Sequence, residues 1–394
     1  MTLPAVIFSG GSEIVSLSLA DTLSFYDVPL IIVTANGQTI IPKTDNVLAI
    51  ITFDWRGDDG AVDVLNLLKR LEALSGGHSK LVAFASEDGS LRFLLENSHT
   101  LQSLLKIYPK SNLRYGGLDK AEFFSSLSNK LSCLAESYVF SDFDRLVAFL
   151  AQKNSDYIIK PAMKPCSMSL GELGKKVFQY HAGVRSDLGL LERSWFISEQ
   201  WVVQKPLLTG EGAEISWYGA RLHSGKIVGM TAREERKYPA MGGSACYVCL
   251  VENQRLCELA ESVLKACDFI GMAEISFLQD SNGDWKVIEL NPRPWLQIGL
   301  ADTAQPPLSY GHYRDACHRD YDQQMFGIVV PYGNSWVCPE RLIAHLLTKR
   351  HSPLLKEWLF VISALWRANY KTIYSTSGLS VKFAWLLRLL KKVL

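Results

Sequence analysis

Residues 287–295, with the sequence VIELNPRPW, place polar side chains inside an otherwise apolar segment. In a β-strand successive side chains point to opposite faces, so Val287, Glu289 and Asn291 would share one face while the residues between them point into a core. A carboxylate and an amide would then offer oxygen atoms on the same side of the strand. Hard cations such as Mg²⁺ take oxygen ligands, so this segment predicts part of a cation site.

A second strand is expected to lie beside this one. The segment GMAEISFLQDSNGDWKVIELNPR holds Asn-Gly at 282–283 between two alternating apolar runs, which is a strong hairpin signal. With that pair at the turn, Glu274 faces Asn291 and Ser276 faces Glu289. A single acid could lie on a solvated strand face, but four convergent polar positions favour a platform. Mg²⁺ is usually held by few protein groups together with substrate phosphates, which suits this set.

Phosphates bound at such a platform require positive charge, and three basic positions are candidates. Lys160 ends the apolar strand YIIKP. Arg233 and Arg236 lie in AREERKYPAMGGSA, which reads as a charged loop, and its residues 242–244 could let backbone N–H groups approach an anion. Each of these residues could instead be an ordinary solvated charge.

The N-terminal segment predicts a doubly wound parallel sheet. PAVIFSGG reads as a buried strand ending in a glycine turn, EIVSLSLADTLSFYD as an amphipathic helix and VPLIIVT as a second strand. The apolar segments VLAIITF and LVAFAS continue this alternation to about residue 110. The Gly10-Gly11 turn lacks the dinucleotide-binding pattern, so a structural role is expected for this domain.

The rest of the chain divides into two further segments. Residues 116–335 read as α+β, with DKAEFFSSLSNKLSCLAES and DFDRLVAFLAQ as helices and DYIIKP and WVVQKP as strands. Helices dominate residues 336–394. The expected domains are therefore 1–115, 116–335 and 336–394.

The composition of the 394 residues is that of an ordinary globular protein. A net charge of +1 argues against a nucleic-acid partner, whose binding domain would normally be basic. Eight scattered cysteines form no disulfide framework, and the CxxC at 246–249 has no second pair to complete a metal site. The N-terminus lacks a basic secretion signal, and no apolar run reaches the length of a membrane span. A cytoplasmic location is expected.

Residues 110–335 resemble the ATP-grasp superfamily, in the branch of carboxylate–amine ligases similar to carbamoyl-phosphate synthetase and the pyrrolysine-biosynthesis ligase. The motif IELNPRPW carries most of the resemblance, followed by VVQKPLLTGEGAEIS and YIIKP. The resemblance implies an α/β and α+β chain: an N-terminal doubly wound parallel sheet, then an ATP-grasp fold and a C-terminal helical segment. It also implies ATP and Mg²⁺ as cofactors.

The resemblance assigns nucleotide contacts to particular residues. Lys160 would contact the α- and β-phosphates, and Lys130 in SNKLS resembles an earlier phosphate-binding basic position. In VVQKPL, Gln204 would reach the exocyclic amine of adenine, Lys205 would offer its carbonyl and Leu207 its N–H group.

The remaining assignments concern the ribose, the metal and the reacting phosphate. Glu211 stands where a ribose-binding acid is expected, with Glu214 as its competitor. Arg293 would stabilise charge on the transferring phosphoryl group, and the loop 233–244, with Arg233 and Arg236, would cover the γ-phosphate and substrate.

The metal set departs from the pattern at one position. Many relatives have an acid or amide where this chain has Ser276, so Glu274 would take over as a ligand beside Glu289 and Asn291.

The implied reaction joins a carboxylate to an amine. ATP would phosphorylate a small-molecule carboxylate, and an amine would attack the acyl phosphate to give an amide, ADP and phosphate. Positioning and charge neutralisation dominate phosphoryl transfer, and no nucleophilic serine or cysteine is required. A carboxylate kinase or carboxylase, and a non-catalytic nucleotide-binding protein, remain alternatives.

The C-terminal segment has a different charge from the rest of the chain. Residues 340–394 hold ten Lys/Arg against two Asp/Glu (+8), and the preceding residues hold 31 against 38 (−7). LLKEWLFVISALW and the amphipathic LSVKFAWLLRLLKKVL could form interfacial helices on the inner face of a membrane. Packing on the enzyme or on a second copy in a homodimer is the favoured alternative.

Overall fold

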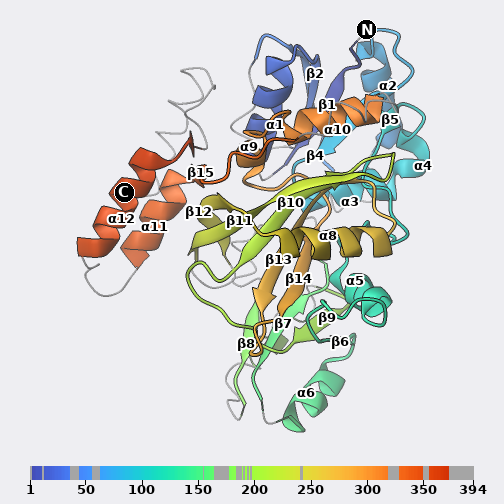
Figure 1. Ribbon diagram of the computed structural model, residues 1–394. Helices are drawn as coiled ribbons and strands as arrows, with labels where there is room; N and C mark the ends of the chain where they lie inside the picture. Colours follow the sequence, from blue (N-terminus) through green and yellow to red (C-terminus); the bar gives the residue numbers. More distant parts are fainter. Residues whose placement is uncertain are drawn as a thin grey trace.

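The computed structural model describes most of the chain in ordered elements (Figure 1). Its described residues are 2–10, 13–35, 44–55, 63–153, 155–163, 177–182, 189, 191–192, 195, 198–239, 243–317, 328–348 and 355–371. Within these ranges the strands form sheets of five, seven and four strands. Figure 1 shows the five-stranded sheet at the top, the seven-stranded sheet in the middle and the four-stranded sheet below.

The five-stranded N-terminal sheet is parallel, with strand order β3-β2-β1-β4-β5. Alternation along β1 explains its two covered faces: Ile7 packs with the apolar side of α1, whereas Val6 and Phe8 pack with α2 and α3. The expected doubly wound sheet is confirmed. Its elements are β1 (Ala5–Ser9), α1 (Glu13–Phe25), β2 (Leu30–Thr34), β3 (Val47–Thr52), α2 (Val64–Leu74), β4 (Leu81–Ala85), α3 (Asp88–Glu96), α4 (Ser98–Leu101) and β5 (Leu105–Lys106).

The seven-stranded sheet has the order β14-β13-β10-β11-β12-β15-β16. Helix α8 (Gln254–Ala266) covers one face, burying Leu256, Val263 and Leu264 against Ile275 and Phe277 of the sheet. The strands are β10 (Ile215–Arg221), β11 (Ile227–Tyr238), β12 (Ser244–Val251), β13 (Gly271–Gln279), β14 (Trp285–Asn291), β15 (Ser335–Val337) and β16 (Tyr370–Lys371).

The four-stranded sheet is antiparallel and has the order β6-β9-β7-β8. Helix α6 covers it, with Leu146 and Leu150 buried against Tyr157 and Trp201. Its elements are β6 (Ser137–Phe140), β7 (Tyr157–Pro161), β8 (Phe178–Tyr180) and β9 (Trp201–Gln204), with α5 (Lys120–Leu127) before it and α6 (Phe143–Ala151) beside it.

Two elements differ from the sequence expectation. The helix expected over residues 119–137 ends at Leu127, because the following segment runs beside β14: Val287 N–H donates to Cys133 O (2.7 Å) and Ala135 N–H to Val287 O (3.0 Å). The charged segment AREERKY is not a loop but the second half of β11, paired with β12 through two irregular steps. In both segments tertiary pairing outweighs local sequence preference.

The helices after the seven-stranded sheet pack in two directions. Helices α9 (Ile298–Ala301) and α10 (Leu308–Cys317) lie on the N-terminal sheet, where Tyr313 Oη donates to Leu3 O (2.5 Å) and Thr22 Oγ1 to Asp302 (2.8 Å). One hydrophobic core therefore crosses the boundary predicted at residue 115. Helices α11 (Pro339–Thr348) and α12 (Leu355–Arg367) project from the edge of the large sheet (Figure 1).

Candidate active site

The hairpin of β13 and β14 carries the predicted metal ligands. Glu274 pairs with Asn291 and Ser276 with Glu289, as the sequence predicted. The turn is different: Asp280 N–H donates to Asp284 O (2.9 Å), which closes a three-residue loop in which Gly283 has φ +85°. A β-bulge after Ser276 then restores the predicted register at the site.

The bulge also moves Val287 away from the polar face. Strict alternation placed this side chain beside Glu289, but Val287 pairs with Phe277 and is fully buried in the core. The extra residue in β14 reverses the alternation at that point. The predicted position of the Val287 side chain was therefore wrong. The predicted pairing of Glu289 with Ser276 and of Asn291 with Glu274 is confirmed.

The polar platform extends over four adjacent strands, β14, β13, β10 and β11. Asn291 Nδ2 donates to Glu274 Oε2 (3.0 Å), and the hydroxyls of Ser276 and Ser216 lie 3.0 Å apart. Ser216 Oγ donates to Glu234 Oε1 (3.3 Å). Sequence reasoning missed Ser216 and Glu234 because they lie on β10 and β11, and no local signal reports that β10 pairs with β13 and β11 with β10.

The buried acids of the platform have raised pKa values, because burial and neighbouring negative charges disfavour their ionised forms. Burial, reinforced by the charge of Glu234, raises the pKa of Glu274 to about 8. Burial and the neighbouring Glu214 raise the pKa of Glu234 to about 7. Although burial alone would lower the pKa of Lys237, Glu234 and Glu214 raise it above its ordinary value. Carboxylates gathered in this way favour cations that neutralise them.

Two lysines face Glu289 from different elements. Asp119 caps α5 by accepting from Ala121 N–H, which makes Lys120 the first helical residue. Lys120 Nζ then lies 3.0 Å from Glu289 Oε1. Lys160 lies on β7, where burial lowers its pKa while Glu289 opposes that shift.

The structure places Lys120, rather than Lys130, beside the predicted metal ligands. Lys130 is exposed beyond the end of α5, and its charge acts on the thiol of Cys267 at the end of α8. The sequence offered only the helix N-cap at Asp119, which predicts where α5 begins but not that Lys120 lies beside Glu289.

Arg293 is held by the N-terminal domain. Its Nε and Nη2 lie 2.7 and 2.5 Å from Asp88 Oδ1, and Nη1 donates to Pro294 O (2.9 Å). Asp88 is the first residue of α3, and two residues separate it from the end of β4. The N-terminal domain, for which a structural role was expected, thus contributes a carboxylate that holds Arg293 in place.

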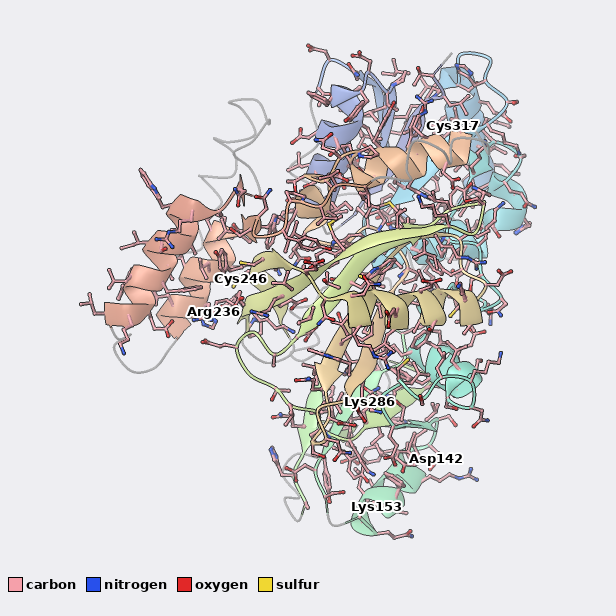
Figure 2. The ribbon with its side chains drawn as sticks, viewed as in Figure 1. Asp142, Lys153, Arg236, Cys246, Lys286 and Cys317 are labelled. Atoms are coloured by element: carbon pink, nitrogen blue, oxygen red, sulfur yellow. The ribbon has the colours of Figure 1, made fainter. Side chains whose placement is uncertain are left out.

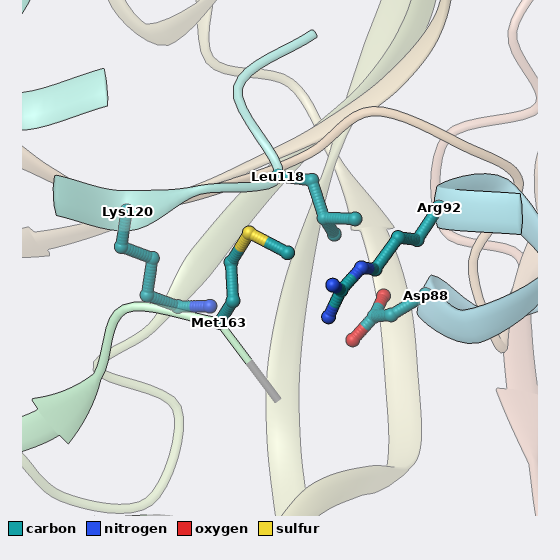
Figure 3. Close-up of a pocket in the computed structure, with 5 residues that line it drawn as sticks. All are labelled: Asp88, Arg92, Leu118, Lys120 and Met163. Carbon is teal, nitrogen blue, oxygen red and sulfur yellow. The ribbon is translucent and has the colours of Figure 1, made fainter. Parts of the chain in front are cut away.

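A small hollow lies where the N-terminal and central domains meet (Figure 3). Figure 3 shows Lys120 on one side, Asp88 and Arg92 on the other, and the apolar side chains between them. It is lined by Asp88, Arg92, Leu118, Lys120 and Met163. Charged groups of both signs therefore lie beside apolar atoms at this position.

The segment predicted to hold adenine leaves the end of β9. Gln204 is buried, and its Nε2 donates to Ser137 Oγ (2.8 Å). Lys205 is exposed and pairs with Glu136 (2.6 Å), whereas Leu207 packs at the edge of the core. Leu208 N–H donates to Gln279 O (2.8 Å), which ties this segment to β13. The adenine contacts of Gln204, Lys205 and Leu207 stay predictions.

The two candidate ribose acids belong to different networks. Glu214 bonds Lys237 and adjoins the buried acid Glu234. Glu211 is half-exposed and lies 3.1 Å from Arg236 Nη2. The choice between these two acids for the ribose therefore stays open.

Arg233 and Arg236 lie on β11 and not in a covering loop. The guanidinium of Arg236 stacks 4.1 Å from the centre of the Phe360 ring of α12, which places it at the base of the C-terminal helices (Figure 2). Arg233 is half-exposed, 3.8 Å from Glu235. Residues 240–242 of the predicted loop lie outside the described residues. The γ-phosphate roles of both arginines stay predictions.

A test of the buried platform is the pH dependence of stability in Glu274→Gln. The folded-state pKa of Glu274, about 8, is above its ordinary value of 4.5, so between these values the folded state holds a proton that the unfolded state has lost. The wild-type protein therefore loses stability as pH rises through this interval. Glutamine cannot ionise, yet it can accept the Asn291 hydrogen bond.

We expect the melting temperature of Glu274→Gln minus that of the wild type to become more positive between pH 5 and pH 9 by several degrees. The measurement is thermal melting with a chelator present, so that no bound cation alters the titration. A difference that stays constant with pH would show that Glu274 is ionised in the folded protein at neutral pH.

The fold is similar to several solved structures. They include N5-carboxyaminoimidazole synthetase from Staphylococcus aureus complexed with ADP (TM-score 0.58, 14% identity, 79% of this chain and 78% of that chain). The L-amino acid ligase from Bacillus licheniformis matches with a TM-score of 0.61 and 10% identity, and the match covers 80% of this chain and 75% of that chain. The biotin carboxylase–βγ-ATP complex from Campylobacter jejuni matches with a TM-score of 0.61 and 12% identity, and the match covers 80% of this chain and 71% of that chain.

These likenesses show that the chain has the ATP-grasp fold, which confirms the expected fold class. No protein-family model matches the sequence, and no curated protein matches it significantly.

Proposed function

We propose that the protein is an ATP- and Mg²⁺-dependent ligase that joins a carboxylate to an amine through an acyl phosphate. The observation that carries the proposal is the ion pair of Lys120 with Glu289 (3.0 Å), on a strand that leads to Arg293, which Asp88 holds. Solved structures of this fold include an ADP complex and an amino acid ligase, which supports the same chemistry.

The residues present fit a magnesium ion. Glu289 and Asn291 would hold it, with Glu274 behind them, and their oxygens are the donors that Mg²⁺ prefers. Glu289 already faces a cation, the ammonium of Lys120. The described residues include no cluster of three His, Cys, Asp or Glu able to hold a metal alone, which suits an ion that also depends on substrate phosphates. When bound, the ion would neutralise phosphate charge.

The chain's own groups would act mainly by binding and orientation. Lys120 and Lys160 would bind phosphate oxygens by charge-assisted hydrogen bonds. Arg293, fixed by Asp88, would stabilise charge on the γ-phosphoryl group as the substrate carboxylate forms a bond to phosphorus and the bond to ADP breaks. The amine nitrogen would then bond to the acyl carbon, lose a proton and release phosphate.

ADP release measured over a panel of carboxylic acids and amines tests this function. We expect ADP to form only with ATP, Mg²⁺ and one acid–amine pair present together, and mass detection to show one amide per ADP. Bicarbonate is included as an acid, since carboxylation would point to a carboxylase. ADP that forms without any amine, with an acyl phosphate as the end product, would replace the ligase by a carboxylate kinase.

A further inference from the structure

The outer face of α12 is apolar and open to solvent. Five large side chains recur there at helical spacing and are exposed: Leu355 (74%), Trp358 (43%), Leu359 (56%), Ile362 (60%) and Trp366 (86%). Within the described residues, five of the twelve exposed large apolar side chains therefore lie on this one helix. Scattered exposed apolar residues are ordinary, but a continuous stripe marks an interaction surface.

The opposite face of α12 accounts for its attachment to the protein. Val361 and Ala364 are buried in the main core, and Phe360 contacts the Tyr247 ring (5.5 Å) and the Arg236 guanidinium. The helix is thus fixed by one side while its second apolar side faces outward, at the edge of the molecule (Figure 1). An amphipathic helix in a water-soluble setting would normally present charges there.

The net charge of the sequence segment that contains α12 selects among the candidate occupants of its exposed face. Residues 340–394 carry +8, and residues 372–394, which follow the described part of α12 and β16, hold four Lys/Arg and no Asp/Glu. A second copy docked through the same segment would bring together two segments that each carry +8, and residues 372–394 of the same chain are themselves positive. An anionic surface complements this segment instead.

We propose that α12 docks on the surface of an anionic phospholipid bilayer, with Leu355, Trp358, Leu359, Ile362 and Trp366 entering the interface. Tryptophan is favoured at the headgroup level, where its ring is partly apolar and its N–H polar. Basic residues beside an apolar helical face strengthen such binding to anionic lipid. Within the described residues no helix is long and apolar enough to cross a bilayer. Helix α12 has 13 residues, fewer than the roughly 20 that a membrane span requires, so it would lie in the plane of the surface. This proposal does not depend on the ligase reaction.

Vesicle flotation of the full chain tests the proposal. We expect the wild type to float with phosphatidylcholine–phosphatidylglycerol vesicles, to float far less with phosphatidylcholine alone, and to be released by high salt. The double variant Leu359→Glu/Ile362→Glu should bind at least about tenfold more weakly, because two apolar contacts become charges that an anionic surface repels.

Leu65→Glu/Leu48→Glu is the matched control. It makes the same change at two exposed leucine side chains (62% and 55%) of the N-terminal domain, and it should float like the wild type. Thermal melting is the measurement that tests whether each variant folds. Binding of the α12 variant equal to that of the control would overturn the proposal. A wild type that does not float would also overturn it. In that case, a dimer detected by light scattering that the α12 variant abolishes would assign the exposed face to a second copy. A loss of melting temperature in the α12 variant alone would assign it to packing within the chain.

Discussion

Replacing Glu289 by glutamine should lower kcat/KM for ADP formation about 10²- to 10³-fold. The change preserves the size of the side chain but removes the negative charge that pairs with Lys120 and that raises the pKa of the buried Lys160. An amide is a weaker ligand for a hard cation than a carboxylate, so charge on the reacting phosphates would be less well neutralised. The Mg²⁺ concentration needed for half-maximal activity should rise in the same variant.

The control for Glu289→Gln is Asp284→Asn on the same hairpin. Asp284 lies in the exposed turn of β13 and β14, far along the strand from the platform, so the same carboxylate-to-amide change should leave turnover within about twofold. Activity and Mg²⁺ dependence are measured together by coupled ADP detection. Full activity of Glu289→Gln, at unchanged Mg²⁺ dependence, would remove Glu289 from the metal site.

Local sequence pattern was sufficient to predict the hairpin at the centre of the site. Alternating apolar residues define which side chains share a face, and the turn signal defines which positions pair. The prediction of the pairs Glu274–Asn291 and Ser276–Glu289 was correct even though the turn itself has another geometry. The bulge compensates for the longer loop, and no simple periodic pattern reports a bulge.

The remaining parts of the site come from elements far apart in the sequence. Lys120 reaches Glu289 from α5, and Asp88 reaches Arg293 from a different domain. Such contacts depend on how domains pack, which periodicity and motif spacing do not record. The sequence contained the helix cap before Lys120 but gave no reason to prefer that lysine to Lys130.

The sequence also predicted a wrong secondary structure for a charged strand, the second half of β11. The segment AREERKY reads as a loop because strands rarely carry so many charges. The structure shows why it is a strand: Lys237 pairs with the buried acids Glu214 and Glu234, and Arg236 stacks on Phe360. Because these charges have partners in the folded protein, pairing this segment with β12 does not leave a buried charge without a partner, and the large free-energy penalty of such a charge is avoided.

Arg293→Lys should lower kcat about 10²-fold with a smaller effect on the KM for ATP. The guanidinium donates to Asp88 through two nitrogens and to Pro294 O through a third, a planar arrangement that a lysine ammonium cannot reproduce. A group that acts on charge formed in the transition state affects kcat more than substrate binding. Initial rates over a range of ATP concentrations separate the two parameters.

Asp88→Asn identifies the contribution of the N-terminal domain to that effect. Asp88 is a positioning residue that acts through Arg293, so its substitution should lower kcat about tenfold alone and add little to Arg293→Lys. Glu72→Gln, an exposed acid on α2 of the same domain, is the matched control and should leave kcat unchanged. If Asp88→Asn and Arg293→Lys instead multiply in the double variant, Asp88 acts on the substrate directly. The hollow that Asp88 shares with Arg92 and Lys120 would then be the place where that contact is made.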